Sequence, residues 1–280
     1  MKKILIAGAN SYIGVSLENY LNTFDGAYHV ETLDVIGDGW KARDLSGYDA
    51  MICVAGIAHQ KETAENAALY YRVNRDLAEE LARKAKQAGI GQFVFLSSMS
   101  VYGMEEGVIT PETRPAPASN YGKSKLEAEE RIALLREENF AVAMLRPPMV
   151  YGKNCRGNFQ LMRKLVEKSP MFPVVNNRRS MISVTNLCGF IRLAVDRRLD
   201  GLFCPQNREY VNTTEMAKIM ADAMGRKVWF SRLAGWGVGI LMPVVGVAQK
   251  AFGSLSYDGW ETFDYCYCEE TLDESVRRSV

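Results

Sequence analysis

The chain has 280 residues, 48% of them hydrophobic and 24% charged, which is the composition of an ordinary globular protein with a substantial core. Its 34 lysines and arginines and 33 acidic residues leave a net charge of +1, so nothing points to a nucleic acid or an anionic membrane as partner. The six cysteines come without a recognisable secretion signal, which predicts free thiols and a cytoplasmic protein.

Apolar runs alternate with helical patterns through the first two-thirds of the chain. The predicted strands are Lys3–Ala7, His29–Leu33, Ala50–Val54, Gln92–Leu96 and Ala141–Leu145. The predicted helices between them are Ile13–Phe24, Asn66–Ala88 and Ser119–Glu138. This alternation predicts an α/β fold, a doubly wound parallel sheet with helices on both faces.

After Tyr151 the pattern loosens. Helices are predicted at Asn158–Glu167, Thr185–Asp196 and Thr213–Met224, with short strands at Phe172–Val175 and Lys227–Phe230. We therefore divide the chain into a sheet domain, 1–150, and mainly a small C-terminal substrate-binding lobe, 151–280, with Thr185–Arg198 packing back on the sheet.

The apolar segment Leu233–Phe252 is interrupted by four glycines and Pro243, so it falls short of an integral membrane span. We expect it to pack as a C-terminal segment in preference to contacting a membrane. Cys266 and Cys268 lack a second ligand pair at a suitable spacing, so we expect no metal. His59 follows the third strand, and a loop histidine bonded to backbone is preferred there over a substrate contact.

A glycine-containing turn follows the first strand. Gly8 permits a tight turn, Gly14 permits close packing of the next helix, and Ser11 occupies the position of the middle glycine in a dinucleotide-binding loop. Backbone N–H groups and the positive end of the helix favour a pyrophosphate there. The Ser11 hydroxyl either crowds the diphosphate or donates to it. The residues assigned to this loop are Gly8, Asn10, Ser11, Tyr12, Ile13 and Gly14.

Asp34 ends the second strand, about 20 residues beyond the loop. A carboxylate at this place accepts hydrogen bonds from ribose hydroxyls and repels a 2′-phosphate, which favours NAD over NADP. Lys41 and Arg43 lie close enough in sequence to keep NADP open. A solvated turn residue is the alternative for Asp34.

Tyr121 and Lys125 are four residues apart in a predicted helix and therefore share a face. A phenol has an ordinary pKa of about 10, and a nearby ammonium and an oxidised nicotinamide both favour its ionised form. Such a phenolate takes the proton of a substrate hydroxyl as hydride leaves the same carbon. Lys125 can also grip the nicotinamide ribose. The spacing alone is common by chance, and the serine-rich segment Ser97–Gly103 at a strand end strengthens the catalytic interpretation.

Together these motifs resemble the extended short-chain dehydrogenase/reductase family, particularly its nucleotide-sugar epimerases and reductases, over roughly Lys2–Val195. The resemblance implies a Rossmann-type sheet, NAD with NADP as the alternative, a UDP-linked sugar substrate, and a homodimer. It also implies Ser98 as the catalytic serine beside Tyr121 and Lys125. The further residues implied at the dinucleotide site are Asp44, Leu45, Ala55, Gly56, Asn74 and Pro147.

By the same resemblance, Asn158 and Arg179 grip the diphosphate of the substrate. The fork of an arginine suits phosphate oxygens, and a surface charge is the alternative for Arg179. The sequence Arg146-Pro147-Pro148 resembles that of enzymes from bacterial surface-polysaccharide pathways.

Departures from the family pattern bear on the reaction. Met99 and Ser100 stand where 4,6-dehydratases carry an acid and a base, which disfavours elimination. Met149 stands where 4-epimerases usually carry asparagine, which raises an NAD(P)H-dependent 4-keto-sugar reductase as the alternative. We favour a UDP-sugar 4-epimerase. A non-catalytic dinucleotide-binding regulatory or assembly protein is the alternative of another class, and it predicts loss of the serine, tyrosine or lysine.

Overall fold

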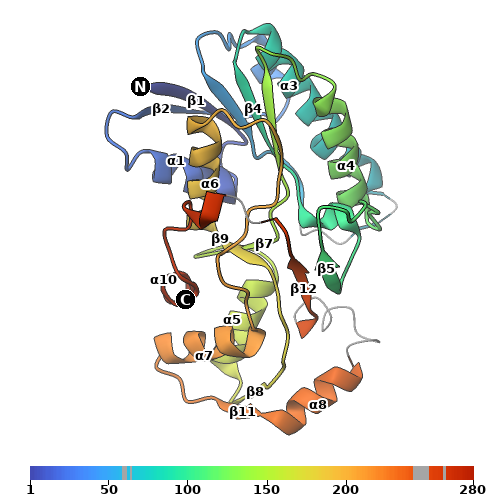
Figure 1. The fold of residues 1–280 in the computed structure, drawn as a ribbon, viewed down its shortest axis with the longest axis vertical. Helices are drawn as coiled ribbons and strands as arrows, with labels where there is room; N and C mark the ends of the chain where they lie inside the picture. Colours follow the sequence, from blue (N-terminus) through green and yellow to red (C-terminus); the bar gives the residue numbers. More distant parts are fainter. Residues whose placement is uncertain (59–61, 64, 242–251, 261–262) are drawn as a thin grey trace. The chain divides into compact units, whose positions relative to one another are not determined.

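A computed structural model describes residues 1–280 except 59–61, 64, 242–251 and 261–262 (Figure 1). His59 and most of the apolar segment beyond residue 241 lie outside the described residues. The chain divides into two compact units. The first comprises residues 1–103, 114–147 and 187–205, and the second comprises 104–113, 148–186 and 206–280.

The first unit is built on a parallel sheet of six strands in the order β10-β6-β4-β3-β1-β2. Its strands are β1 (Lys2–Ala7), β2 (Tyr28–Leu33), β3 (Ala50–Cys53), β4 (Gln92–Leu96), β6 (Ala141–Leu145) and β10 (Gly201–Phe203). The five strands predicted from the sequence are present, and β10 is an addition. Every residue of β3, β4 and β6 is buried, as expected for strands covered on both faces. The predicted fold class is therefore confirmed.

Helices cover both faces of this sheet. Figure 1 shows α3 (Leu77–Gln87) and α4 (Asn120–Ala133) on one face, and α1 (Tyr12–Leu21) and α6 (Val184–Asp196) on the other. The helix predicted over residues 66–88 is continuous but not uniform: α2 (Ala67–Tyr70) passes into a π-helical stretch, η2 (Tyr71–Asp76), before α3. Such π turns are frequent at functional sites.

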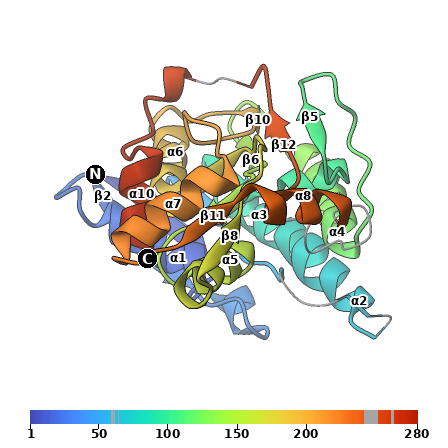
Figure 2. The same ribbon diagram turned by 90° about the horizontal axis from the view of Figure 1, so that it is seen from below.

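The second unit contains three short parallel strand pairs, four α-helices and a short 3-10 helix, η4 (Phe263–Tyr265), among its described residues. The strand pairs are β5 (Gly107–Ile109) with β12 (Leu255–Tyr257), β7 (Met149–Tyr151) with β9 (Met181–Ser183), and β8 (Met171–Pro173) with β11 (Trp229–Ser231). The helices are α5 (Asn158–Lys168), α7 (Thr213–Ala223), α8 (Arg232–Leu241) and α10 (Leu272–Ser279). Figure 2 shows α8 beside β8, which it contacts.

Aromatic side chains form much of the core of this unit. Tyr151 stacks on Phe159 with ring centroids 5.2 Å apart. The ring centroid of Phe172 lies 6.0 Å from that of Phe230 and 6.1 Å from that of Phe252. None of the helices in the described part of the chain combines the length and apolar character needed to span a bilayer.

Candidate active site

The loop after β1 has the geometry that its glycines predict. Gly8 has φ +121°, and a Cβ there would lie 2.8 Å from the backbone nitrogen of Ala55. A Cβ on Gly14 would lie 2.7 Å from the carbonyl oxygen of Gly8 and from Ser11 Oγ. Contacts this short with backbone atoms exclude a larger residue at Gly8 without a shift of the chain. The loop is therefore a tight turn into α1 that depends on both glycines.

Ser11 is the N-cap residue of α1. Its Oγ accepts a hydrogen bond from the backbone N–H of Gly14 at 3.0 Å. Where a glycine would leave this position flexible, the Ser11 side chain therefore caps the helix. The remaining N–H groups of the first turn have no acceptor within the helix, which suits an anion at this end.

Neighbouring strands place the other predicted dinucleotide residues around this loop. The backbone N–H groups of Gly8 and Ala9 donate to the carbonyl oxygen of Leu33 at 3.1 and 3.2 Å, next to Asp34. On the other side, Ala55 N–H donates to the carbonyl oxygen of Ala7 at 3.0 Å. Asp34 is exposed, and its Oδ1 accepts from the N–H of Ile36 at 2.9 Å. The loop therefore lies between Asp34 and the end of β3.

Asp44 and Leu45 have different surroundings. Leu45 is buried in the core of the sheet unit. The exposed Asp44 carboxylate accepts from the N–H and the hydroxyl of Ser46, both at 2.9 Å, and these hydrogen bonds lower the pKa of Asp44. Their role beside an adenine stays a prediction.

Asn74 links the segment that follows β3 to α4 through hydrogen bonds. This fully buried residue lies in the π-helical stretch η2, and its Oδ1 accepts from the N–H of Ile57 at 2.8 Å. Its Nδ2 donates to the carbonyl oxygen of Ile57 at 3.1 Å and to Ser124 Oγ at 3.2 Å. A Cβ on Gly56 would lie 3.0 Å from Asn74 Oδ1 and 3.2 Å from Lys125 Nζ. Glycine at this position therefore lets both side chains approach the strand end.

The structure brings Ser98, Tyr121 and Lys125 together at the end of β4. Ser98 is the N-cap of the short helix η3 (Met99–Tyr102), and its Oγ accepts from the N–H of Ser100 at 3.1 Å. Ser98 Oγ donates to Ser100 Oγ at 3.2 Å, and Ser98 lies close enough to Tyr121 to lower the pKa of its phenol. Lys125 Nζ donates to the carbonyl oxygen of Leu96 at 2.8 Å, two residues before Ser98. Tyr121 and Lys125 thus reach the same strand end from adjacent turns of α4.

Burial dominates the electrostatics of these groups. It raises the pKa of Tyr121, Ser98 opposes that rise, and Tyr70 adds to it. Burial also lowers the pKa of Lys125 to about 8, against the influence of Cys53 and Glu129. We expected an adjacent ammonium to make the phenol more acidic. In the chain alone the pKa of Tyr121 is raised instead, because burial outweighs the effect of Ser98, and the Lys125 ammonium bonds the Leu96 carbonyl.

Two neighbours of Tyr121 were not predicted from the sequence. The Glu62 carboxylate accepts from the N–H groups of Asn120 and Tyr121 at 2.9 and 3.0 Å, at the positive end of α4. The buried ring of Tyr70 meets that of Tyr121 edge-on, with centroids 6.5 Å apart. No pattern in the sequence links Glu62 to α4. Tyr70 lies one helical turn before Asn74, and this spacing could have placed Tyr70 on the same helix face as Asn74.

A buried ion pair supports the same region from behind. Glu129 lies one turn after Lys125 on α4, and its two oxygens accept from Arg146 Nε at 3.0 Å and Nη2 at 2.5 Å. Arg146 Nη1 donates to the hydroxyl of Tyr102 at 2.9 Å. All three side chains are buried. Next to Arg146, the carbonyl oxygen of Pro147 accepts from Met99 N–H at 2.9 Å. The network joins α4, η3 and the end of β6.

The two predicted diphosphate ligands belong to the second unit. Asn158 is the first residue of α5. Arg179 Nη1 donates to the carbonyl oxygen of Gly253 at 2.7 Å, while its Nε is buried with no hydrogen-bond partner among the described residues. Burial lowers the pKa of Arg179, and Glu105 and Glu106 oppose this. An incompletely bonded buried guanidinium is a group that an anion can satisfy.

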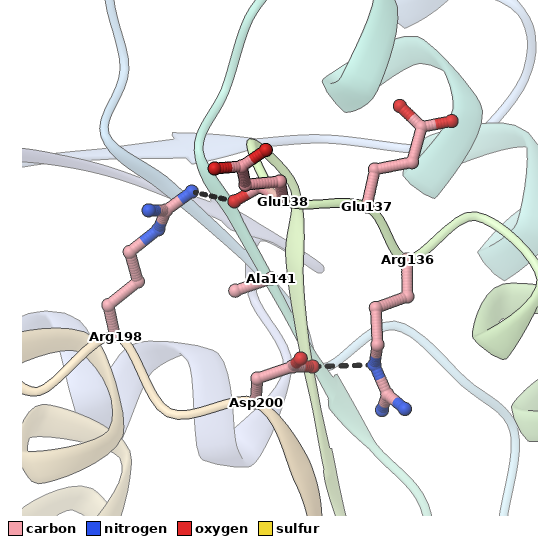
Figure 3. A pocket seen from close by; sticks show the side chains of 6 residues that line it. All are labelled: Arg136, Glu137, Glu138, Ala141, Arg198 and Asp200. Carbon is pink, nitrogen blue, oxygen red and sulfur yellow. Dashed lines mark hydrogen bonds and ion pairs between the residues drawn. The ribbon is translucent and has the colours of Figure 1, made fainter.

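A separate hollow lies where β6 and β10 begin, at the opposite edge of the sheet from the loop after β1 (Figure 3). Arg136 Nε pairs with Asp200 there at 2.6 Å, and Arg198 donates to the carbonyl oxygens of Gly91 and Glu138. Both guanidinium groups are already engaged, so we assign no ligand to this hollow. The described residues also contain no cluster of three potential metal ligands.

The fold and site together define a class of protein: a dinucleotide-binding α/β protein with serine, tyrosine and lysine side chains at the end of a central strand. Comparison with known families makes this specific. The model of the NAD dependent epimerase/dehydratase family matches residues 4–201, and the chain belongs to that family. The family predicted from the sequence is thereby confirmed, and with it, at the level of the family, the expectation of an NAD-dependent enzyme.

Several relatives are similar over much of their length. UDP-glucose 4-epimerase of Vibrio cholerae is 28% identical over an alignment that covers 100% of this chain and 94% of that protein. N-acetyl-alpha-D-glucosaminyl-diphospho-ditrans,octacis-undecaprenol 4-epimerase of Escherichia coli O157:H7 is 28% identical over 68% of this chain and 62% of that protein. Among solved structures, UDP-glucuronic acid 4-epimerase from Bacillus cereus in complex with NAD superposes with a TM-score of 0.74 at 17% identity, covering 99% of this chain and 97% of that one. At that identity the superposition shows the fold alone.

Proposed function

We propose that this protein is an NAD-dependent enzyme that inverts C4 of a UDP-linked sugar, with Tyr121 as its acid–base group. The observation that carries the proposal is the convergence of three side chains at the end of β4: Ser98 lowers the pKa of the buried Tyr121, and the buried Lys125 ammonium donates to the Leu96 carbonyl two residues before Ser98. The similarity to a UDP-glucose 4-epimerase over the whole chain supports the same reaction.

The residues around the loop after β1 fit a dinucleotide. The first turn of α1 would hold the pyrophosphate, and Asp34 would accept from ribose hydroxyls. Lys41 is paired with Asp38 at 3.0 Å and Arg43 with Glu31 at 2.5 Å, so both cations that kept NADP open already have acidic partners. This supports NAD over NADP. When bound, NAD supplies an acceptor for the hydride of the sugar carbon.

In this scheme each side chain of the site has a distinct task. Ser98 orients the C4 hydroxyl of the sugar and lowers the pKa of Tyr121. Tyr121 takes the hydroxyl proton during oxidation and returns it during reduction. Lys125, with a pKa of about 8, is mostly protonated near neutral pH, and its positive charge favours the phenolate.

Arg179 supports a diphosphate-containing substrate because its buried Nε has an unmet hydrogen bond. Both sugar nucleotides and polyprenyl-diphosphate sugars carry that group, and the E. coli relative is named for a substrate of the second kind. We place UDP sugars first because the relative matched over the whole chain is named for one. Both classes therefore belong in the assay.

The test is incubation of the purified chain with UDP-glucose, UDP-N-acetylglucosamine, their C4 epimers, a UDP-4-keto sugar and a polyprenyl-diphosphate sugar, with and without added NADH, followed by NMR of the products. Inversion at C4 without net consumption of coenzyme is the expected result. Stoichiometric NADH consumption on a 4-keto sugar would instead establish the reductase that Met149 suggests. Dinucleotide binding without turnover of UDP or polyprenyl-diphosphate sugars would establish the regulatory alternative.

We further propose a homodimer in the cytoplasm, as the family resemblance implies. Light scattering on the purified chain tests the first part. A mass equal to one chain across the accessible concentration range would contradict it.

A further inference from the structure

Three large apolar side chains of the second unit face solvent on adjacent elements. Trp229 in β11 is 70% exposed, and Leu233 and Trp236 in α8 are 82% and 72% exposed. Leu233 and Trp236 are three residues apart and so lie on neighbouring turns of α8. Met171, the partner of Trp229 across the β8–β11 pair, is 39% exposed. We call Trp229, Leu233 and Trp236 the aromatic face.

The outward position of these side chains is built into the local packing. A Cβ on Gly235 would lie 1.9 Å from the carbonyl oxygen of Val174, so the backbone of α8 rests directly on the chain that leaves β8. Gly235 is buried while Leu233 and Trp236 on either side of it are exposed. In β11 the ring of Phe230 packs on Phe172, which leaves Trp229 outside. We expected Leu233–Phe252 to pack, and at Leu233 and Trp236 that expectation is wrong.

The charges next to the aromatic face in the sequence have one sign. Arg226, Lys227 and Arg232 are exposed and flank Trp229 in the sequence. Residues 223–257 contain four bases and no aspartate or glutamate, in a chain whose acids and bases otherwise balance. The preceding acid, Asp222, is already paired with Arg277 at 2.7 Å. Arg226, Lys227 and Arg232 have no ion pair with another described residue, and exposed tryptophans beside such bases match a surface that is apolar beneath and anionic above.

We propose that the aromatic face docks on the surface of an anionic lipid bilayer. Tryptophan rings reside at the level of lipid headgroups, and Leu233 between them is placed to enter the acyl boundary. Arg226, Lys227 and Arg232 contact lipid phosphates, an attraction that weakens as salt is added. The aromatic face lies in the interface, and no described helix has the length and hydrophobicity needed to cross the membrane. The three exposed bases favour a bilayer over a second copy of this chain, whose corresponding bases would repel them.

The test uses the full chain and vesicles of phosphatidylcholine with or without phosphatidylglycerol, separated by flotation. We expect the protein to float with the anionic vesicles and much less with the neutral ones. The variant Leu233→Ser/Trp236→Ser should weaken binding by about tenfold or more. Leu134→Ser, which removes a side chain of matched 83% exposure at the end of α4, should bind as the parent does.

A charge variant separates the contribution of the three bases to vesicle binding from that of the aromatic face. Arg226→Gln/Lys227→Gln/Arg232→Gln should lose the preference for anionic vesicles and the dependence on salt, while thermal unfolding by circular dichroism shows that each variant is folded. No binding to anionic vesicles, or equal binding by the parent and the aromatic-face variant, overturns the proposal. So does a dimer that Leu233→Ser/Trp236→Ser dissociates without any vesicle binding by the parent. None of these readouts depends on catalysis.

Discussion

Replacement of Arg146 by methionine should strongly destabilise the protein, because it leaves Glu129 without its partner. Glu129 is 4% exposed and accepts two hydrogen bonds from Arg146, and Arg146 Nη1 also donates to Tyr102. The pKa of Arg146 is raised, since Glu129 outweighs the opposing effect of burial. Removing one partner of such a buried pair costs about 3–5 kcal/mol, much of it the penalty of an uncompensated charge.

The double variant Arg146→Met/Glu129→Leu separates that penalty from the value of the ion pair itself. Because it removes both charges, it should cost far less than Arg146→Met alone, and the residual loss is mainly the hydrogen bond of Tyr102, about 1 kcal/mol. Arg83→Met, which breaks the more exposed pair with Glu79 on α3, serves as a control and should cost less than about 1 kcal/mol.

Urea unfolding of the parent, Arg146→Met, Glu129→Leu, the double variant and the Arg83→Met control gives the free energies, and the first four give the coupling. A loss below about 1 kcal/mol for Arg146→Met, or a double variant as unstable as the sum of both single ones, would refute the reasoning.

Three further predictions concern the chemistry of the site. Tyr121→Phe should reduce turnover by at least about 100-fold and leave dinucleotide affinity, measured by calorimetry, nearly unchanged; Tyr70→Phe, which keeps the edge-on ring contact, is the matched control, and retained activity in Tyr121→Phe would remove Tyr121 as the base. Asp34→Ala should reduce the preference for NAD over NADP by about tenfold in binding titrations, and an unchanged ratio would show that another residue reads the ribose. Because Ser98 lowers the pKa of Tyr121, Ser98→Ala should move the rising limb of kcat/KM against pH to higher pH. A limb at the parent's position would argue that Ser98 does not act on the base.

Local signals allowed the nucleotide side of the site to be predicted. Gly8 and Gly14 belong to a single turn between β1 and α1, so their spacing in the sequence was enough to predict the geometry of that turn. For Ser11 the sequence left two contacts with a diphosphate open, and the structure adds the N-cap of α1. Tyr121 and Lys125 were predictable as one helix face because they lie on adjacent turns of α4.

Contacts between distant segments could not be predicted in the same way. Glu62 caps a helix that begins almost sixty residues later, and no periodicity links the two. The π-helical turn at Asn74 adds no unusual residue type, so the region resembles one continuous helix in sequence. The strand β10 has only three residues, too few for a period to be visible.

The apolar segment after Arg232 shows a different limit. Hydrophobicity suggested packing, whereas Gly235 brings the α8 backbone onto the end of β8 and leaves Leu233 and Trp236 outside. Which face of a short helix is buried is decided by such a backbone approach, and composition does not record it.

The most direct test of the proposed reaction uses a UDP sugar that carries deuterium at C4. If the hydrogen that leaves C4 returns to it within one visit to the site, the inverted product keeps the deuterium while the solvent stays unlabelled. That result is predicted for the protein with Tyr121 intact. Loss of the label to NAD⁺ with accumulation of a keto sugar, exchange of the label with water, or no inversion of any UDP sugar would contradict the account.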